Sequence, residues 1–216
     1  MDITPKKWEL ADRLIVLATI VSIGYAVLRY NIAGEVPWKD VPIYVLNKGI
    51  SLASFFLLVL SFTIGPLKNL GASISDKFLG ARKSLGLAGL MLVFVHFVLS
   101  ITILNPLYYD VFFEENGTLA LRGGLSLFGG VMGLVLLWIY NFTFKENFIK
   151  ASPIIKTLTS KKTISIIFLF VGVHLFFMGY SGWITVHKWQ AGLPPISLIA
   201  FAIFCIGFFL NIIGRR

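Results

Sequence analysis

Charged residues are scarce in this chain. They make up 13% of its 216 residues, whereas 57% of the residues are hydrophobic. In a soluble domain of this length, roughly a quarter of the residues are charged, because its surface faces water. The shortage of charge therefore excludes a large soluble domain and indicates a protein that lies in a membrane.

Cysteine and catalytic motifs are scarce as well. The single cysteine, Cys205, stands inside an apolar run, where it can form neither an intramolecular disulfide nor a cysteine cluster for a metal. No Gly-x-Gly-x-x-Gly loop follows a strand. The apolar runs contain no nucleophile–base pair, no paired carboxylates and no zinc-ligand spacing. An enzyme that converts a substrate of its own is therefore the least favoured interpretation.

Long apolar runs are what the chain has instead. A helix of about 20 apolar residues crosses the hydrocarbon core of a bilayer. Backbone polar groups in lipid must be bonded internally, and none of the runs alternates like a barrel strand, so we expect helices. The sequence predicts an all-α membrane protein, a bundle of six transmembrane helices that forms one integral-membrane domain over residues 1–216. The predicted spans are residues 13–29, 48–67, 84–104, 124–144, 163–186 and 195–213.

The basic residues predict how the bundle is oriented. Of the 19 lysines and arginines, 14 flank one set of span ends and 5 flank the other. Because basic loops stay inside, both termini are expected in the cytoplasm. The net charge of +9 collects in these short loops and forms no single basic face, which argues against a nucleic-acid partner. The inner set is Lys6, Lys7, Arg13, Lys68, Lys77, Arg82, Lys83, Lys145, Lys150, Lys156, Lys161, Lys162, Arg215 and Arg216.

Two of the three histidines lie deep in the predicted spans. His96 stands 12 residues after the start of the third span, and His174 stands 11 residues after the start of the fifth. Both are therefore roughly 17 Å from the inner face, on helices that cross in the same direction. Two neutral imidazoles at one depth can bind one b-type haem from its two faces, an arrangement that favours electron transfer over oxygen chemistry.

A plainer interpretation of the same two histidines stays open. Each ring could hydrogen-bond to a neighbouring helix and do nothing more. Small residues beside the histidines suit both interpretations, because they admit either a flat macrocycle or a closely packed helix. On the haem interpretation, Gly86 and Gly89 of the third span contact the cofactor, as do Gly172, Gly179 and Gly182 of the fifth.

The third histidine, His187, is harder to place. It follows His174 by 13 residues, which corresponds to about 20 Å along a helix and some 140° around it. The two side chains face one cofactor column only if the helix is distorted. The outer end of the third span, residues 105–110, offers no histidine as a partner. One haem site is predicted, and a second site at His187 stays open.

Several of these residues together resemble a known family. Gly65–Leu67, the Arg-Lys-Ser-Leu-Gly-Leu stretch at 82–87, His96 after it, and the pair His174 and His187 resemble the ferric-reductase-like transmembrane domain. The resemblance covers about residues 44–190. It is nearest to the MsrQ-type branch, the haem-binding membrane subunit of the periplasmic methionine-sulfoxide reductase system. The residues around His174 depart from the family's Trp-x-x-Leu-His-Arg-Leu pattern.

The resemblance implies a cofactor and a location. It implies that His96, His174 and His187 bind haem b. It also implies a multi-pass protein of the bacterial inner membrane, in contact with lipid. An associated flavin mononucleotide (FMN) is implied by the resemblance only. Arg82 could pair with the haem propionates, although a role in orienting the protein in the membrane explains it equally well.

The function that follows is transmembrane electron transfer. The flavin and nicotinamide domains of the larger relatives do not follow in this sequence, so we expect electrons from a membrane quinol or a cytosolic flavin reductase. The resemblance implies a periplasmic redox protein, such as a methionine-sulfoxide reductase, as the acceptor. Two alternatives stay open: a ferric reductase that acts directly at the outer face, and a membrane scaffold or transporter without redox chemistry.

Overall fold

Six long helices form the protein. The computed structural model describes residues 9–142, 157 and 161–214. In that part of the chain, six helices are long and apolar enough to cross a membrane, and the only extended pairing is a single bridge between Phe113 and Leu119. The predicted all-α, six-helix membrane bundle is confirmed. The helices are α1 (Leu10–Val27), α2 (Leu46–Asn69), α3 (Asp76–Thr102), α4 (Leu121–Asn141), α7 (Lys161–Ile184) and α8 (Ile196–Ile213).

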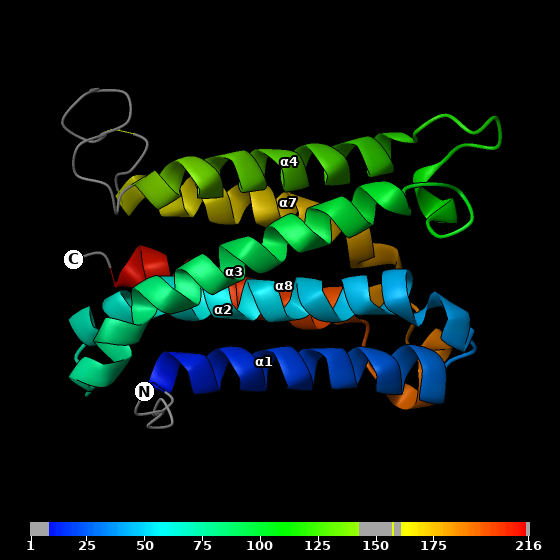
Figure 1. Ribbon diagram of the computed structural model, residues 1–216. Coiled ribbons are helices and arrows are strands. Elements are labelled where there is room, and N and C mark those ends of the chain that lie inside the picture. The colour runs from blue at the N-terminus through cyan, green and yellow to red at the C-terminus, as the bar shows by residue number, and fades with distance from the viewer. Residues whose placement is uncertain (1–8, 143–156, 158–160, 215–216) are drawn as a thin grey trace, which may run out of the picture.

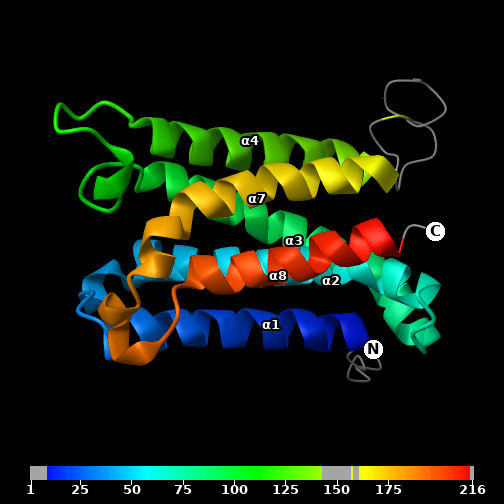
Figure 2. The ribbon, with the colours of Figure 1, turned by 180° about the vertical axis from the view of Figure 1, so that it is seen from behind.

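Helix α2 lies at the centre of the bundle. It packs against α1, α3 and α8, while α4 packs against α7, and α7 also contacts α8. Figures 1 and 2 show the α4–α7 pair on one side, α1 at the opposite edge, and α3 crossing obliquely between α2 and α4. More of α2 is buried than of any other spanning helix in the described residues. Helix α2 is therefore the common packing partner of α1, α3 and α8.

Both ends of the described chain lie at the same end of the bundle (Figure 1), as six spans require. We call this the termini end, and we call the opposite end, with residues 103–120 and 185–195, the loop end. Which end faces the cytoplasm stays a prediction. Seven of the basic residues that support it lie outside the described residues, at positions 6, 7, 145, 150, 156, 215 and 216.

The third spanning helix begins earlier than hydropathy predicts. Helix α3 begins at Asp76, eight residues before the predicted start at Ser84. Asp76 lies in the first turn, where a negative charge stabilises the helix dipole. The charged first turns end the apolar run without ending the helix, so the pair Arg82 and Lys83 lies within α3 and not in a loop before it.

Short turns shape the loop end. The π-helical turn η1 (Leu28–Ile32) continues α1, and a second one, η3 (Val41–Val45), leads into α2. They bring the rings of Tyr30 and Tyr44 to a centroid distance of 6.0 Å. Four 3-10 turns complete this end: η2 (Trp38–Asp40), η4 (Asp110–Phe112), η6 (Val186–Lys188) and η7 (Gln190–Gly192). The loop end is thus built from short turns that position individual side chains.

Glycine allows the closest contact between α1 and α2. A Cβ atom on Gly49 would lie 2.7 Å from the Cα atom of Ile23, which is backbone and cannot rotate away. Membrane helices associate through such small residues, because lipid supplies no hydrophobic drive between them. Gly24, next to Ile23 on α1, differs from Gly49, since nothing lies within 4 Å of the Cβ position there.

Gly49→Ala should lower the melting temperature of the detergent-solubilised protein, whereas Gly24→Ala should leave it unchanged or raise it. The first substitution overpacks a backbone contact at a cost of about 1–3 kcal/mol. The second adds a methyl group in open space and favours the helix by about 0.5–1 kcal/mol. Thermal unfolding followed by size-exclusion chromatography checks both variants, and equal melting temperatures would contradict this packing.

Candidate functional site

A cavity of about 400 Å³ lies between α2, α3, α4 and α7, with part of α8. It runs from the middle of the bundle toward the loop end. Its deep walls are apolar and include Leu58, Val93 and Leu134. Nearer the loop end it is lined by polar side chains, among them Lys48 and Tyr109. The cavity therefore has an apolar interior and a polar mouth.

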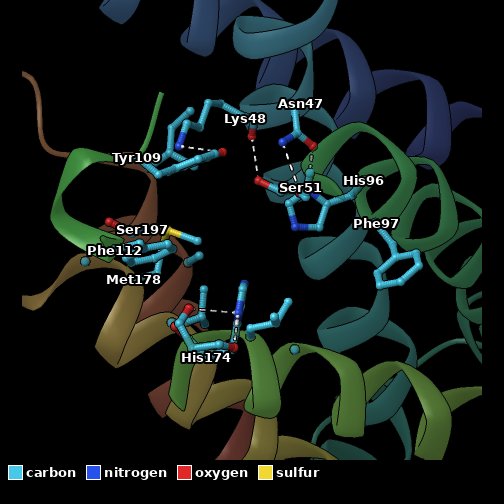
Figure 3. A pocket seen from close by; sticks show the side chains of 18 of the residues that line it. Asn47, Lys48, Ser51, His96, Phe97, Tyr109, Phe112, His174, Met178 and Ser197 are labelled. Carbon is cyan, nitrogen blue, oxygen red and sulfur yellow. Dashed lines mark hydrogen bonds between the residues drawn. The ribbon is translucent and has the colours of Figure 1, made fainter. Parts of the chain in front are cut away.

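His96 and His174 lie on opposite walls of this cavity (Figure 3). His96 comes from α3 and His174 from α7, and their ring centroids are 6.4 Å apart with an angle of 69° between the ring planes. The two rings therefore lie next to each other inside the bundle. Helices α3 and α7 are not sequence neighbours, so only the bundle brings these rings together.

Helix α2 holds the His96 ring. The Nδ1 atom of His96 lies 2.6 Å from Oδ1 of Asn47, which is fully buried. Because an amide oxygen can only accept, Nδ1 is the donor. The amide nitrogen of Asn47 donates in turn to Oγ of Ser100, one helical turn after His96. This closed network fixes the position of Asn47 and, through it, the orientation of the imidazole.

Helix α4 holds the His174 ring. The Nδ1 atom of His174 lies 2.9 Å from the backbone carbonyl oxygen of Ser126, so Nδ1 donates here too. The hydroxyl of Ser126 donates back to the carbonyl of His174. Two glycines allow this approach: a Cβ atom on Gly129 would lie 2.8 Å from the backbone nitrogen of His174, and one on Gly130 would lie 3.0 Å from Nδ1.

The second nitrogen of each ring remains for a ligand. No described residue hydrogen-bonds to Nε2 of His96 or of His174. Neither Nε2 is among the buried polar atoms that lack a partner, so both are reached from the cavity. A metal-binding imidazole typically donates its other N–H to a carbonyl or carboxylate, which sets the tautomer and the ring orientation. Both rings follow this pattern.

The separation of the rings suits one metal between them. Two metal–nitrogen bonds of about 2 Å on opposite sides of one ion put the ring centroids roughly 6 Å apart. The angle between the planes is no obstacle, because each ring has only to point its nitrogen at the metal. Among the described residues, no group of three or more His, Cys, Asp or Glu side chains could hold a metal ion. Two histidines alone suit a metal that a macrocycle already binds.

Lys48 provides a positive charge at the mouth of the cavity. Its Nζ atom lies 3.4 Å from the hydroxyl oxygen of Tyr109 and over the rings of Tyr44 and Tyr109, 5.0 and 4.6 Å from their centroids. No carboxylate among the described residues forms an ion pair with it. Arg122 also lines the cavity, but it donates to the backbone carbonyls of Phe177 and Met178.

The predicted role of Gly86 and Gly89 in contacting a cofactor is not supported. A Cβ atom on Gly86 would meet Oγ of Ser61, and one on Gly89 would meet the side chain of Leu58. Both glycines therefore face α2 and allow α2 and α3 to pack closely, and neither lines the cavity. On the fifth span, Gly172 faces the Phe204 ring, whereas Gly179 and Gly182 do line the cavity.

Arg82 and His187 also lie away from the cavity. Arg82 stands near the termini end of α3, where its Nε donates to the carbonyl of Ser61. It precedes His96 by 14 residues, which is about 21 Å of helix. His187 is exposed in η6, because α7 ends at Ile184, three residues before it. The structure therefore brings two of the three histidines together and leaves the third at the surface of the loop end.

Sequence reasoning missed the residues that hold the rings. Ser126 is a polar residue within a predicted span, and Asn47 directly precedes one. This signal could have singled them out, because buried polar groups in membranes need partners. Lys48 follows Asn47 directly and was counted only as a charge that flanks a span. Tyr109 and the carbonyl of Ser126 carry no sequence signal, since their roles depend on which helices meet.

Comparison with known proteins adds no identification. No family model matches the sequence, and no curated protein matches it. The function is therefore inferred from the geometry of the cavity.

The hydrogen bonds predict the tautomers of both cavity histidines. In ligand-free protein, His96 and His174 should carry the proton on Nδ1 and leave Nε2 bare. The nearest partner of each Nδ1 is an oxygen that can only accept, at 2.6 and 2.9 Å, whereas the serine hydroxyls of Ser100 and Ser126 lie farther away, at 3.3 and 3.2 Å. The ¹⁵N spectrum of protein labelled at histidine checks this, with His96→Ala and His174→Ala assigning the signals. The exposed His187 is the internal reference. A proton on Nε2 of either ring would contradict the geometry.

Proposed function

We propose that this protein is a haem b-binding membrane protein that transfers electrons across the bilayer. One observation carries the proposal: His96 and His174 face each other across a cavity at a centroid distance of 6.4 Å, and both Nδ1 atoms are bound to protein oxygens. Haem b bound there would supply a one-electron carrier. The resemblance to the ferric-reductase-like transmembrane domain implies the same function.

The residues around the rings suit this role. Asn47 and the Ser126 carbonyl accept the Nδ1 protons, so each ring presents the unprotonated Nε2 that metal ligation requires. The apolar side chains at the deep end, such as Leu134 and Val171, exclude water. His96 and His174 would together hold the haem iron and would leave no coordination position for oxygen or substrate. These features favour electron transfer over catalysis at the metal.

The direction of transfer follows from the predicted orientation. With both termini in the cytoplasm of a bacterial cell, the mouth of the cavity at the loop end would face the periplasm. We propose a quinol or a cytosolic flavin reductase as the donor, and a periplasmic redox protein such as a methionine-sulfoxide reductase as the acceptor. FMN binding stays an implication of the resemblance alone.

Purified protein from haem-replete cells should be coloured, with about one haem per chain and a sharp α-band after reduction with dithionite. His96→Ala and His174→Ala should each lose this band, because each removes one of the two axial ligands. His187→Ala should keep it, since His187 lies outside the cavity. Visible spectra of the four proteins, with haem quantified per chain, make the test.

The outcomes of this experiment separate the alternatives. Colourless wild-type protein would overturn the proposal of electron transfer. The histidines would then only hydrogen-bond neighbouring helices, in a scaffold or transporter. Loss of half the haem in His187→Ala would mean a second site that uses His187. A ferric reductase would have the same spectrum, but the purified reduced protein would be reoxidised by ferric chelates without any protein partner.

The ring-holding role of Asn47 predicts a second effect. Asn47→Leu should weaken haem binding about 10- to 100-fold, because the loss of a partner behind a metal-binding histidine has an effect of this size. Asn211→Leu is the matched control: Asn211 is equally buried, but it donates to the carbonyl of Gly207 in its own helix and does not line the cavity. Haem titration of both variants checks the effect, and equal affinities would contradict the role of Asn47.

A further inference from the structure

We infer that Lys48 binds an anionic carboxylate of the molecule that fills the cavity, and so orients that molecule with its acidic edge toward the loop end. The inference rests on the proposed function, because it takes the cavity to hold a haem, whose propionates are the carboxylates in question. It adds to that function the residue that anchors the haem edge and the end of the bundle toward which the edge points.

The positive charge of Lys48 is not compensated by a carboxylate of the described residues. Lys48 is half-buried within a predicted membrane span, where a cation is costly unless something pairs with it. Within the described chain, no carboxylate makes an ion pair with Lys48. Asp110 also lines the cavity, but its Oδ1 accepts from the backbone nitrogen of Val111. A carboxylate supplied by the ligand would compensate the charge.

The ammonium group of Lys48 has more N–H donors than the protein satisfies. An ammonium group has three N–H donors. Among the described residues, the only hydrogen bond of the Lys48 ammonium is the long one to the Tyr109 hydroxyl, at 3.4 Å. The ring faces of Tyr44 and Tyr109 attract the charge through cation–π contact, but a ring face has no lone pair to accept an N–H. At least two donors are therefore left for a ligand. Figure 3 shows the Lys48 side chain beside Tyr109 at the margin of the cavity that both histidines enter.

The cavity is apolar in its interior and carries its positive charge at the loop end. Its apolar walls suit the hydrocarbon body of a macrocycle, and its cation stands at the loop end. Arg122 is the other cation there. Hydrogen bonds from its Nε and Nη2 to the carbonyls of Phe177 and Met178 hold its guanidinium over the ring of Tyr180, 4.6 Å from the centroid. Its Nη1 has donors left, but the group is fixed at two points, whereas the Lys48 ammonium makes one long hydrogen bond. Arg82, the residue that the sequence suggests for the propionates, lies near the opposite end of α3 and outside the cavity. Lys48 is therefore the cation best placed to receive a carboxylate.

Haem and its dimethyl ester distinguish the role of Lys48 from haem binding itself. Protein purified without haem in a neutral detergent is titrated with ferric protoporphyrin IX and with the dimethyl ester of the same compound, which keeps the metal and loses both charges. Wild-type protein should bind the free acid about tenfold more tightly than the ester, since a charge-assisted hydrogen bond is worth this much or more. The readout is the ratio of the two dissociation constants.

The variants assign the preference to one residue. Lys48→Met should lower the preference for the free acid about tenfold relative to wild type, by weakening the free acid and leaving the ester unchanged, and Lys48→Arg should restore the preference. Lys39→Met is the matched control, because Lys39 is an exposed lysine at the same end and does not line the cavity. It should keep the wild-type ratio. Partitioning of the ester into detergent affects all proteins equally and cancels between them.

Each outcome decides a separate question. Wild-type protein that binds both compounds equally would overturn the role of Lys48 and leave the proposed function standing, and this measurement needs no variant to fold. A preference that survives in Lys48→Met would overturn it as well. If neither compound binds wild-type protein with the spectrum of a bis-histidine haem, the proposed function fails, and the inference fails with it.

Discussion

Two imidazole rings inside this bundle each donate an Nδ1 proton to an oxygen of a neighbouring helix, His96 to Asn47 of α2 and His174 to Ser126 of α4. The interior of a membrane offers no water to satisfy such groups, so the protein has to supply each partner from another helix. The two bonds join α2 to α3 and α4 to α7, and they turn both Nε2 atoms toward one cavity. The proposed ligand site depends on these two bonds.

The remaining features of the site follow from the position of α2. This helix is the most buried of the described spans, and its consecutive residues Asn47 and Lys48 serve the cavity in different ways. Asn47 orients a ring at the depth where the metal would lie, and Lys48 brings a positive charge to the mouth. The glycines Gly86 and Gly89 let α3 pack closely against α2. A change in how α2 packs would therefore disturb the rings and the cation together.

Hydropathy predicted the six-helix fold, because the bilayer sets the length of a span. The similar positions of His96 and His174 in their predicted spans indicated that the two rings could meet. Hydropathy and residue positions do not show which helix faces which. Gly86 and Gly89 face α2, and Arg82 lies far from the cavity. The start of α3 was missed because its first turns carry charge. His187 lies outside the cavity, in a turn after the end of α7. Ser126 acts through its backbone carbonyl, which no side-chain pattern reveals.

Near-infrared magnetic circular dichroism of the oxidised, haem-loaded protein tests the central claim most directly, because it reports the axial ligands of ferric haem. A rival ligand in the described part of the cavity wall is the thioether of Met178, four residues after His174 on α7. The account predicts the low-spin signature of two imidazole ligands. A signature of imidazole with thioether, or of high-spin iron with an open position, would contradict the pairing of His96 with His174.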